Sequence, residues 1–157
     1  MKEKIFEILD SLQIQYQNFE HQPTFSTTDA KWVDVPGKRV KSLFLRNKKP
    51  TKYYMVVIED EKALDSNHVR HLLWENKLSF ASEERMLDQI GVRPWHVSPF
   101  ALMNNKNHDL EVIFDENLRD VLIGFHPGRN DNTTVLKMQD IEKYLQHLWN
   151  PYRFLEL

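Results

Sequence analysis

Two short apolar segments joined by a polar turn predict a β-hairpin, and this hairpin is the feature that most limits how the chain can fold. In residues 42–46, leucines recur at the period of two that is typical of a strand. Residues 53–59 contain three consecutive β-branched residues, which indicates a strand in the middle of a sheet. The polar turn at residues 47–50 separates the two strands. The fold must therefore contain a sheet that buries this hairpin.

Six cations lie in and around the first of these strands, between Gly37 and Pro50. They are Lys38, Arg39, Lys41, Arg46, Lys48 and Lys49. A solvated strand end and turn is the ordinary explanation for such a cluster. The alternative is that a lysine held beside a buried strand meets a phosphate group of a ligand.

The rest of the chain alternates irregularly between helical and strand patterns. Helices are predicted at residues 2–13, 26–32, 65–76, 82–90 and 139–149. Strands are predicted at residues 16–19, 77–81, 97–102, 110–114, 121–125 and 133–136. This order favours an α+β (mixed α/β) fold over a doubly wound one. The length of the chain, without an internal repeat or linker, predicts a compact single domain over residues 1–157.

The composition excludes several classes of protein. Hydrophobic residues make up 41% and charged residues 28% of the chain, as in soluble globular proteins. A signal peptide is not recognisable and no apolar run approaches the roughly 18 residues of a membrane span, so a cytoplasmic protein is expected. The absence of cysteine excludes disulfides, thiolate zinc sites and cysteine nucleophiles. A net charge of -2 disfavours extensive coating of nucleic acid, but it permits a small contact with one RNA end.

Four motifs occur in the order and spacing of one known family. They are GKRVKSLFL at residues 37–45, LSFASEE at 78–84, GVRP at 91–94 and FHP at 125–127. From about His21 to Leu145 the chain resembles the YbaK-like aminoacyl-tRNA deacylases, and among them the freestanding editing proteins related to the insertion domain of bacterial prolyl-tRNA synthetase. The resemblance implies a mixed sheet that is partly curled into a barrel and flanked by helices. It also implies a hydrolase that cleaves the ester of mischarged tRNA.

The resemblance assigns catalytic roles to Lys41, Gly91 and His126. Lys41 would hold the 3′ end of the substrate by its charge, because use as a general base would require burial that lowers its pKa by several units. Gly91 opens a loop that would place main-chain amides beside the aminoacyl group, although it is equally an ordinary helix C-cap. His126 could position water, but a lone histidine at a strand end is more often structural.

Trp95 stands where relatives commonly have a second glycine. If that position requires a positive φ, a tryptophan there would be strained. The indole could narrow the pocket, stack on the terminal adenine or simply pack. The candidate substrate-binding residues are His21, Phe25, Ser42, Arg46, Pro94, Trp95, Ser98, Asn130 and Thr133.

Hydrolysis of an aminoacyl ester needs a positioned water, a place for oxyanion charge and a grip on the terminal adenosine. It requires neither a metal nor a cofactor, and none is predicted. His68 and His71 share a helical face, but no third ligand is aligned with them.

The most specific expectation is deacylation in trans of alanine attached to proline tRNA. A proline-activating site cannot strongly reject a smaller amino acid, because missing methylenes cost only about 1–3 kcal/mol of discrimination. The alternatives are a deacylase for cysteine or serine, and a noncatalytic module that binds a tRNA end or a nucleotide. The expected partners are the tRNA acceptor end and, transiently, prolyl-tRNA synthetase; neither a membrane nor DNA is expected.

Overall fold

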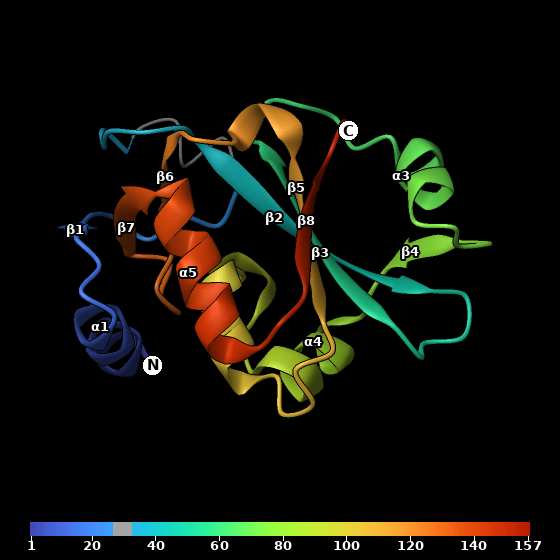
Figure 1. The fold of residues 1–157 in the computed structure, drawn as a ribbon, viewed down its shortest axis with the longest axis horizontal. Helices are drawn as coiled ribbons and strands as arrows, with labels where there is room; N and C mark the ends of the chain where they lie inside the picture. The colour runs from blue at the N-terminus through green and yellow to red at the C-terminus, as the bar shows by residue number, and fades with distance from the viewer. Residues whose placement is uncertain (27–32) are drawn as a thin grey trace.

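The computed structural model describes residues 1–26 and 33–157, which form an α+β fold with two sheets (Figure 1). One sheet has five strands in the order β4-β2-β3-β5-β8, and the other has three in the order β1-β7-β6. The strands are β1 (Gln17–Glu20), β2 (Val40–Asn47), β3 (Tyr53–Glu59), β4 (Leu78–Phe80), β5 (Glu111–Asp115), β6 (Leu122–Phe125), β7 (Asn132–Lys137) and β8 (Tyr152–Leu155). The α-helices are α1 (Lys2–Ser11), α3 (Ser66–Leu72), α4 (Glu83–Ile90) and α5 (Met138–Leu148). Short 3-10 helices are η1 (Pro94–His96), η2 (Pro99–Asn104) and η3 (Glu116–Leu118).

The predicted hairpin is confirmed as β2 and β3, which pair antiparallel from Val40 opposite Glu59 to Arg46 opposite Tyr53. β3 lies between β2 and the parallel strand β5, so it is a central strand as its β-branched run predicted. Alternation along the strands divides the core, because successive side chains point to opposite faces of a sheet. Phe44 therefore packs into one hydrophobic cluster and its neighbour Leu45 into the other.

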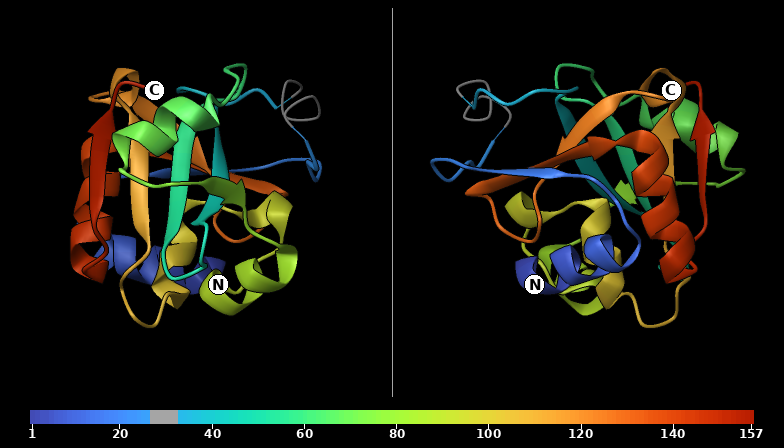
Figure 2. Two further views of the ribbon diagram at one scale, coloured as in Figure 1. Left: turned by 90° about the vertical axis from the view of Figure 1, so that its right-hand side faces the viewer. Right: turned by 60° about the vertical axis from the view of Figure 1, so that its left-hand side comes forward.

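The larger cluster lies between the five-stranded sheet and the elements α1, α4, η2 and α5, and the smaller cluster lies under α3. Figure 2 shows α3 and α5 on different sides of this sheet. The hydroxyl group of Tyr144 on α5 donates to the carbonyl oxygen of Phe100 on η2 at 2.8 Å. Burial raises the pKa of Tyr144. In the described ranges, none of the helices has the length and hydropathy that crossing a membrane requires.

Among the described residues, the two sheets meet at an isolated bridge, in which Lys38 pairs in parallel with Ile123. The Lys38 N–H donates to the carbonyl oxygen of Leu122 at 2.8 Å. Gly37 permits this approach, since its φ is +95° and a Cβ atom would lie 2.9 Å from the Leu122 oxygen. The described strands therefore form two open sheets joined at this seam, rather than one sheet that curls into a barrel.

The sequence predictions for three segments need correction, and a fourth falls outside the described residues. Residues 97–102 are not a strand, because Pro99 lacks an N–H and begins the 3-10 helix η2. Residues 152–155, for which no strand was predicted, form β8 beside β5. The predicted helix at residues 65–76 ends earlier, at Leu72. The predicted helix at 26–32 falls almost entirely on residues 27–32, which lie outside the described ranges.

Candidate active site

A cavity of about 350 Å³ lies at the seam between the two sheets. It is open to solvent and is lined by residues from β2, from the end of β6, from the segment around η1 and from the chain on both sides of residues 27–32. The lining residues are Thr24, Phe25, Ser26, Val33, Val35, Pro36, Lys38, Arg39, Val40, Lys41, Ser42, Leu43, Asp60, Pro94, Trp95, Val97, Gly124, Phe125, His126 and Thr133.

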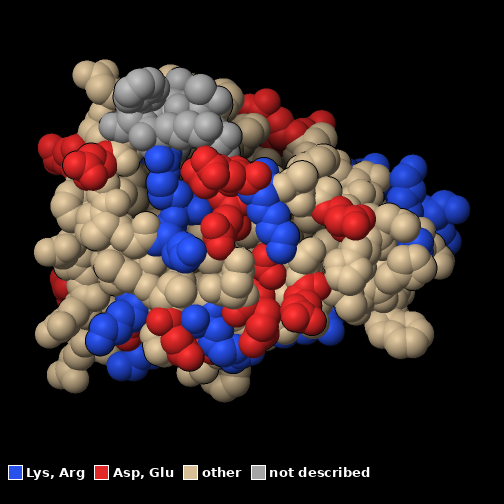
Figure 3. Space-filling model, turned by 90° about the horizontal axis from the view of Figure 1, so that it is seen from above, with Lys and Arg blue, Asp and Glu red and all other residues tan. Residues whose placement is uncertain are grey.

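Among the described residues of this cavity, Lys41 is the cation that has no ion-pair partner. Lys38 forms an ion pair with Glu59 at 3.6 Å, and Arg39 forms one with Asp60 at 3.4 Å. Within the described ranges, no carboxylate lies in ion-pair distance of Lys41. Figure 3 shows basic and acidic side chains interleaved on the face seen from above, so the excess of positive charge here is small.

His126 carries a defined neutral tautomer. Its Nδ1 lies 2.8 Å from the carbonyl oxygen of Asn132, and because a carbonyl can only accept, Nδ1 carries the proton. Desolvation lowers the pKa of His126, with a smaller contribution from the nearby rings of His21 and His96, so the ring is neutral at pH 7. Nε2 is then a hydrogen-bond acceptor, and within the described part of the chain it lies 3.4 Å from the Thr24 hydroxyl oxygen. This nitrogen can accept a hydrogen bond from water in the cavity.

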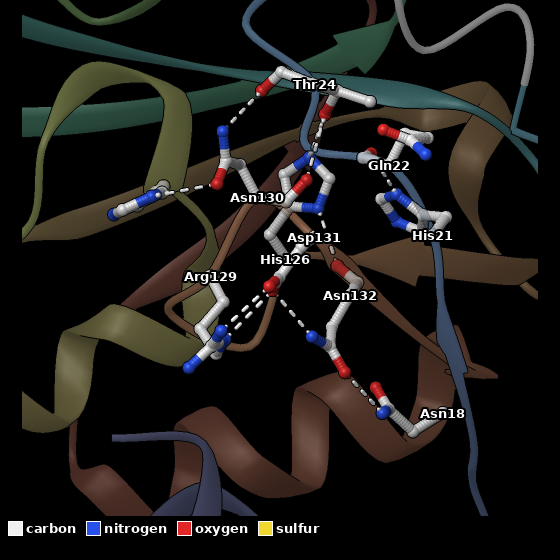
Figure 4. A network of polar contacts seen from close by, with 10 residues as sticks. Asn18, His21, Gln22, Thr24, His126, Arg129, Asn130, Asp131 and Asn132 are labelled. Atoms are coloured by element: carbon white, nitrogen blue, oxygen red, sulfur yellow. Dashed lines mark hydrogen bonds and ion pairs between the residues drawn. The ribbon is translucent and has the colours of Figure 1, made fainter.

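A polar network holds the His126 loop in place (Figure 4). The side-chain amide of Asn130 donates to the carbonyl oxygen of Thr24 at 3.0 Å, and its Oδ1 accepts from Nε2 of His96 at 3.3 Å. The Ser98 hydroxyl donates to the carbonyl oxygen of His126 at 2.7 Å. His126 is therefore fixed from several segments that are distant in the sequence.

Asp131 and Asn132 extend this network away from the cavity. Arg129 binds the Asp131 carboxylate through two nitrogens, at 2.7 and 2.9 Å, and holds the pKa of Asp131 well below its usual range. The amide of Asn132 donates to Asp131 at 2.6 Å, and Asn18 on β1 donates to Asn132 at 2.7 Å. These contacts fix the position of the Asn132 carbonyl oxygen, which accepts the hydrogen bond from His126 Nδ1–H.

The structure brings most of the predicted residues to the cavity. Lys41, His126, Phe25, Ser42, Pro94, Trp95 and Thr133 line it. His21, Ser98 and Asn130 do not line it but contact its walls; Nε2 of His21, for example, lies 2.8 Å from the Thr133 hydroxyl.

Gly91 and Arg46 do not line the cavity. Gly91 is the C-cap of α4 with a φ of 66°, and its N–H donates to the carbonyl oxygen of Leu87 at 2.9 Å. Its own amide is therefore engaged and does not face an oxyanion. Arg46 lies at the other end of β2, where its guanidinium donates to the turn carbonyls of Asn47 and Lys48.

Trp95 forms part of the cavity wall without backbone strain. The non-glycine residues with positive φ in the described ranges are Gln13, Trp74, His108, Asp120 and Trp149. Trp95 sits instead in the 3-10 turn η1, and its ring packs edge-on against Phe25 with 5.6 Å between ring centres. The loop in this chain therefore accommodates a tryptophan at position 95, because the position does not require a positive φ.

Thr24 and Gly124 are cavity residues that sequence reasoning did not select. Gly124 lies on β6, and a Cβ atom there would lie 2.8 Å from Cγ2 of Thr133. A glycine inside an apolar strand signals a close approach and could have drawn attention to it. Thr24 gives no such signal, because its contacts with Asn130 and His126 arise only from the tertiary fold.

Comparison with known proteins gives a consistent result. The family model of the aminoacyl-tRNA editing domain matches residues 21–144. The prolyl-tRNA editing protein ProX of Acetoanaerobium sticklandii is 33% identical and covers 99% of this chain and 97% of its own length. The prolyl-tRNA synthetase associated domain-containing protein 1 of Danio rerio is 24% identical over 93% of this chain and 82% of its own. A solved structure described as a candidate trans-editing enzyme for prolyl tRNA synthetase has the same fold, with a TM-score of 0.70, 19% identity and coverage of 99% and 95%.

Proposed function

Because this chain belongs to the aminoacyl-tRNA editing domain family and is an aminoacyl-tRNA deacylase, we propose that it removes alanine from mischarged proline tRNA, acting in trans. We infer that residues 1–157 act as one editing domain in the cytoplasm. Its partners would be the acceptor end of the tRNA and, transiently, prolyl-tRNA synthetase. The name of the relative from Acetoanaerobium sticklandii supports the choice of the proline system.

The observation that carries this proposal is the pairing of Lys41 and His126 in one cavity. Lys41 offers a cation without a carboxylate partner in the described ranges, which suits the phosphate that precedes the terminal adenosine. His126 offers a neutral acceptor nitrogen, which suits an attacking water. An activated ester requires little more than these two groups and a donor for the oxyanion.

In the proposed mechanism, Lys41 anchors the 3′ end and His126 Nε2 accepts a hydrogen bond from water. The water oxygen attacks the ester carbonyl carbon and gives up a proton, the bond between this carbon and the ribose oxygen breaks, and the ribose oxygen takes up that proton. The products are free alanine and a tRNA with its 3′ hydroxyl restored. The neighbouring ribose hydroxyl assists the proton transfer.

The test is the rate of deacylation of alanyl-tRNA with the proline anticodon, measured for the wild type and for Lys41→Ala. Loss of an anchoring charge at the substrate is expected to lower kcat/KM by about 10²-fold, with Lys41→Arg less affected because it keeps the charge. Correctly charged prolyl-tRNA should be spared.

Each other outcome points to a different function. Hydrolysis of cysteinyl- or seryl-tRNA in place of the alanyl substrate would transfer the activity to another small amino acid. Binding of tRNA without turnover of any of these esters would leave a noncatalytic module. Wild-type rates in Lys41→Ala would remove the anchor role and keep the activity.

A further inference from the structure

The outer edge of β2 contains a gap in its backbone hydrogen bonding. The carbonyl oxygen of Arg39 accepts from the Asp60 N–H at 3.0 Å, so the backbone groups of Arg39 face the β3 side. The carbonyl oxygen of Phe44 accepts from the Ala81 N–H at 3.0 Å, so those of Phe44 face away from β3. The direction in which the backbone N–H and C=O groups point alternates from one residue to the next along an antiparallel strand. The backbone groups of the even-numbered residues of β2 therefore all point away from β3.

The gap comprises the two even-numbered residues Val40 and Ser42. On one side of it, the Lys38 N–H donates a hydrogen bond to the carbonyl oxygen of Leu122 on β6. On the other side, the carbonyl oxygen of Phe44 accepts from Ala81, which follows β4. The strand pairing with β4 itself begins at Leu45. Among the described residues, no backbone group hydrogen-bonds the outward N–H and C=O groups of Val40 and Ser42.

This gap opens into the cavity, since Val40 and Ser42 both line it. Free N–H and C=O groups on a strand edge are a template for another extended segment. An aminoacyl group in an extended conformation presents its α-ammonium and its ester carbonyl on one side, as a strand residue does. The chemistry of the gap therefore matches the part of the substrate that every aminoacyl ester shares.

We propose that the aminoacyl group docks on this gap as a one-residue extension of the five-stranded sheet. The Ser42 N–H donates to the ester carbonyl oxygen. The α-ammonium donates to the carbonyl oxygen of Ser42 in an antiparallel arrangement, or to that of Val40 in a parallel one. Both arrangements use the Ser42 N–H. This assignment rests on the proposed deacylase reaction, in which it supplies the oxyanion donor that Gly91 does not offer through its own amide.

The same N–H acts in the chemical step. When the water oxygen bonds to the carbonyl carbon, the carbonyl oxygen gains negative charge, and a donor fixed on a strand already points at it. When the bond to the ribose oxygen breaks, the electron pair of the oxyanion re-forms the C=O double bond, and the ribose oxygen takes up the proton that the water gave up. Loss of one donor of this kind typically lowers kcat by about 10²–10³.

Ser42→Pro tests the assignment, with Ser42→Ala as its reference. Proline removes the N–H that faces the gap and none that faces β3, so the β2–β3 ladder keeps its bonds. We expect kcat/KM of Ser42→Pro to fall about 10²-fold below that of Ser42→Ala, with an unchanged unfolding midpoint. Val40→Pro removes an amide on the same edge that neither arrangement uses, so its loss should be far smaller. Equal rates for folded Ser42→Pro and Ser42→Ala would overturn the proposal.

A binding measurement separates this proposal from the choice of substrate and from effects on folding. The measurement uses a variant in which Ser42 is replaced by the α-hydroxy acid with the same side chain. The replacement turns the peptide bond before residue 42 into an ester, so the backbone N–H of residue 42 becomes an oxygen atom. Calorimetry then compares the alanyl amide of 3′-amino-3′-deoxyadenosine with adenosine. We expect about tenfold weaker binding of the amide and unchanged binding of adenosine; unchanged binding of both would reject the docking. If this difference appears while alanyl-tRNA is not hydrolysed, the proline-editing function fails and the docking stands.

Discussion

At the residue scale, His126 makes the stability of the protein sensitive to acid. Its pKa in the folded state lies below its usual value, chiefly through desolvation and also through His21 and His96. Between that lowered pKa and the unfolded value of about 6.5, the unfolded state binds more protons. The free energy of unfolding should therefore fall as the pH falls from 6.5 through the folded-state pKa. In His126→Asn, whose amide can still donate to the Asn132 carbonyl, this fall should be smaller, because the group that gains a proton on unfolding is absent. Urea unfolding at several pH values between 5 and 7.5 measures it, and parallel pH profiles for the two proteins would refute the role of His126.

At the element scale, the seam between β2 and β6 determines the shape of the cavity, and Gly37 determines the seam. In Gly37→Ala the new Cβ would lie 2.9 Å from a backbone oxygen of Leu122, which cannot rotate away. We expect a loss of about 1–3 kcal/mol in the free energy of unfolding, together with slower deacylation, since the Lys38 bridge must open. Gly128→Ala is the matched control: its φ of +77° carries a similar backbone cost, but its Cβ would meet only the flexible side chain of Met1. Equal losses of stability and activity in the two variants would show that the seam has no special importance.

At the scale of the whole molecule, the sequence predicted what depends on local patterns and missed what depends on distant partners. The β2–β3 hairpin and the helix α4 agree with the expectations from periodicity. The motifs selected Lys41 and His126, which line one cavity. The strand predicted at 97–102 failed because a proline at its third position starts a 3-10 helix. β8 has only four residues and is a strand only because it meets β5, about forty residues earlier in the chain. The gap in the edge of β2 depends on where β4 and β6 end, and local patterns carry no signal for that.

The charge of the whole molecule limits how it holds RNA. The net charge is -2, and at the cavity Lys38 and Arg39 are already paired with Glu59 and Asp60. Two or three phosphate contacts are then expected, and each contributes a slope of about −0.7 to −0.9 in log affinity against log salt concentration. Raising the salt concentration from 50 to 200 mM should weaken tRNA binding only about tenfold, as measured by filter binding with uncharged proline tRNA. A protein that makes six or more contacts would lose about 10³-fold or more over the same range. A loss of that size here would show that the protein contacts the RNA well beyond its acceptor end. A shallow slope would mean that the choice between aminoacyl-tRNAs is made by the cavity and the aminoacyl group that it binds.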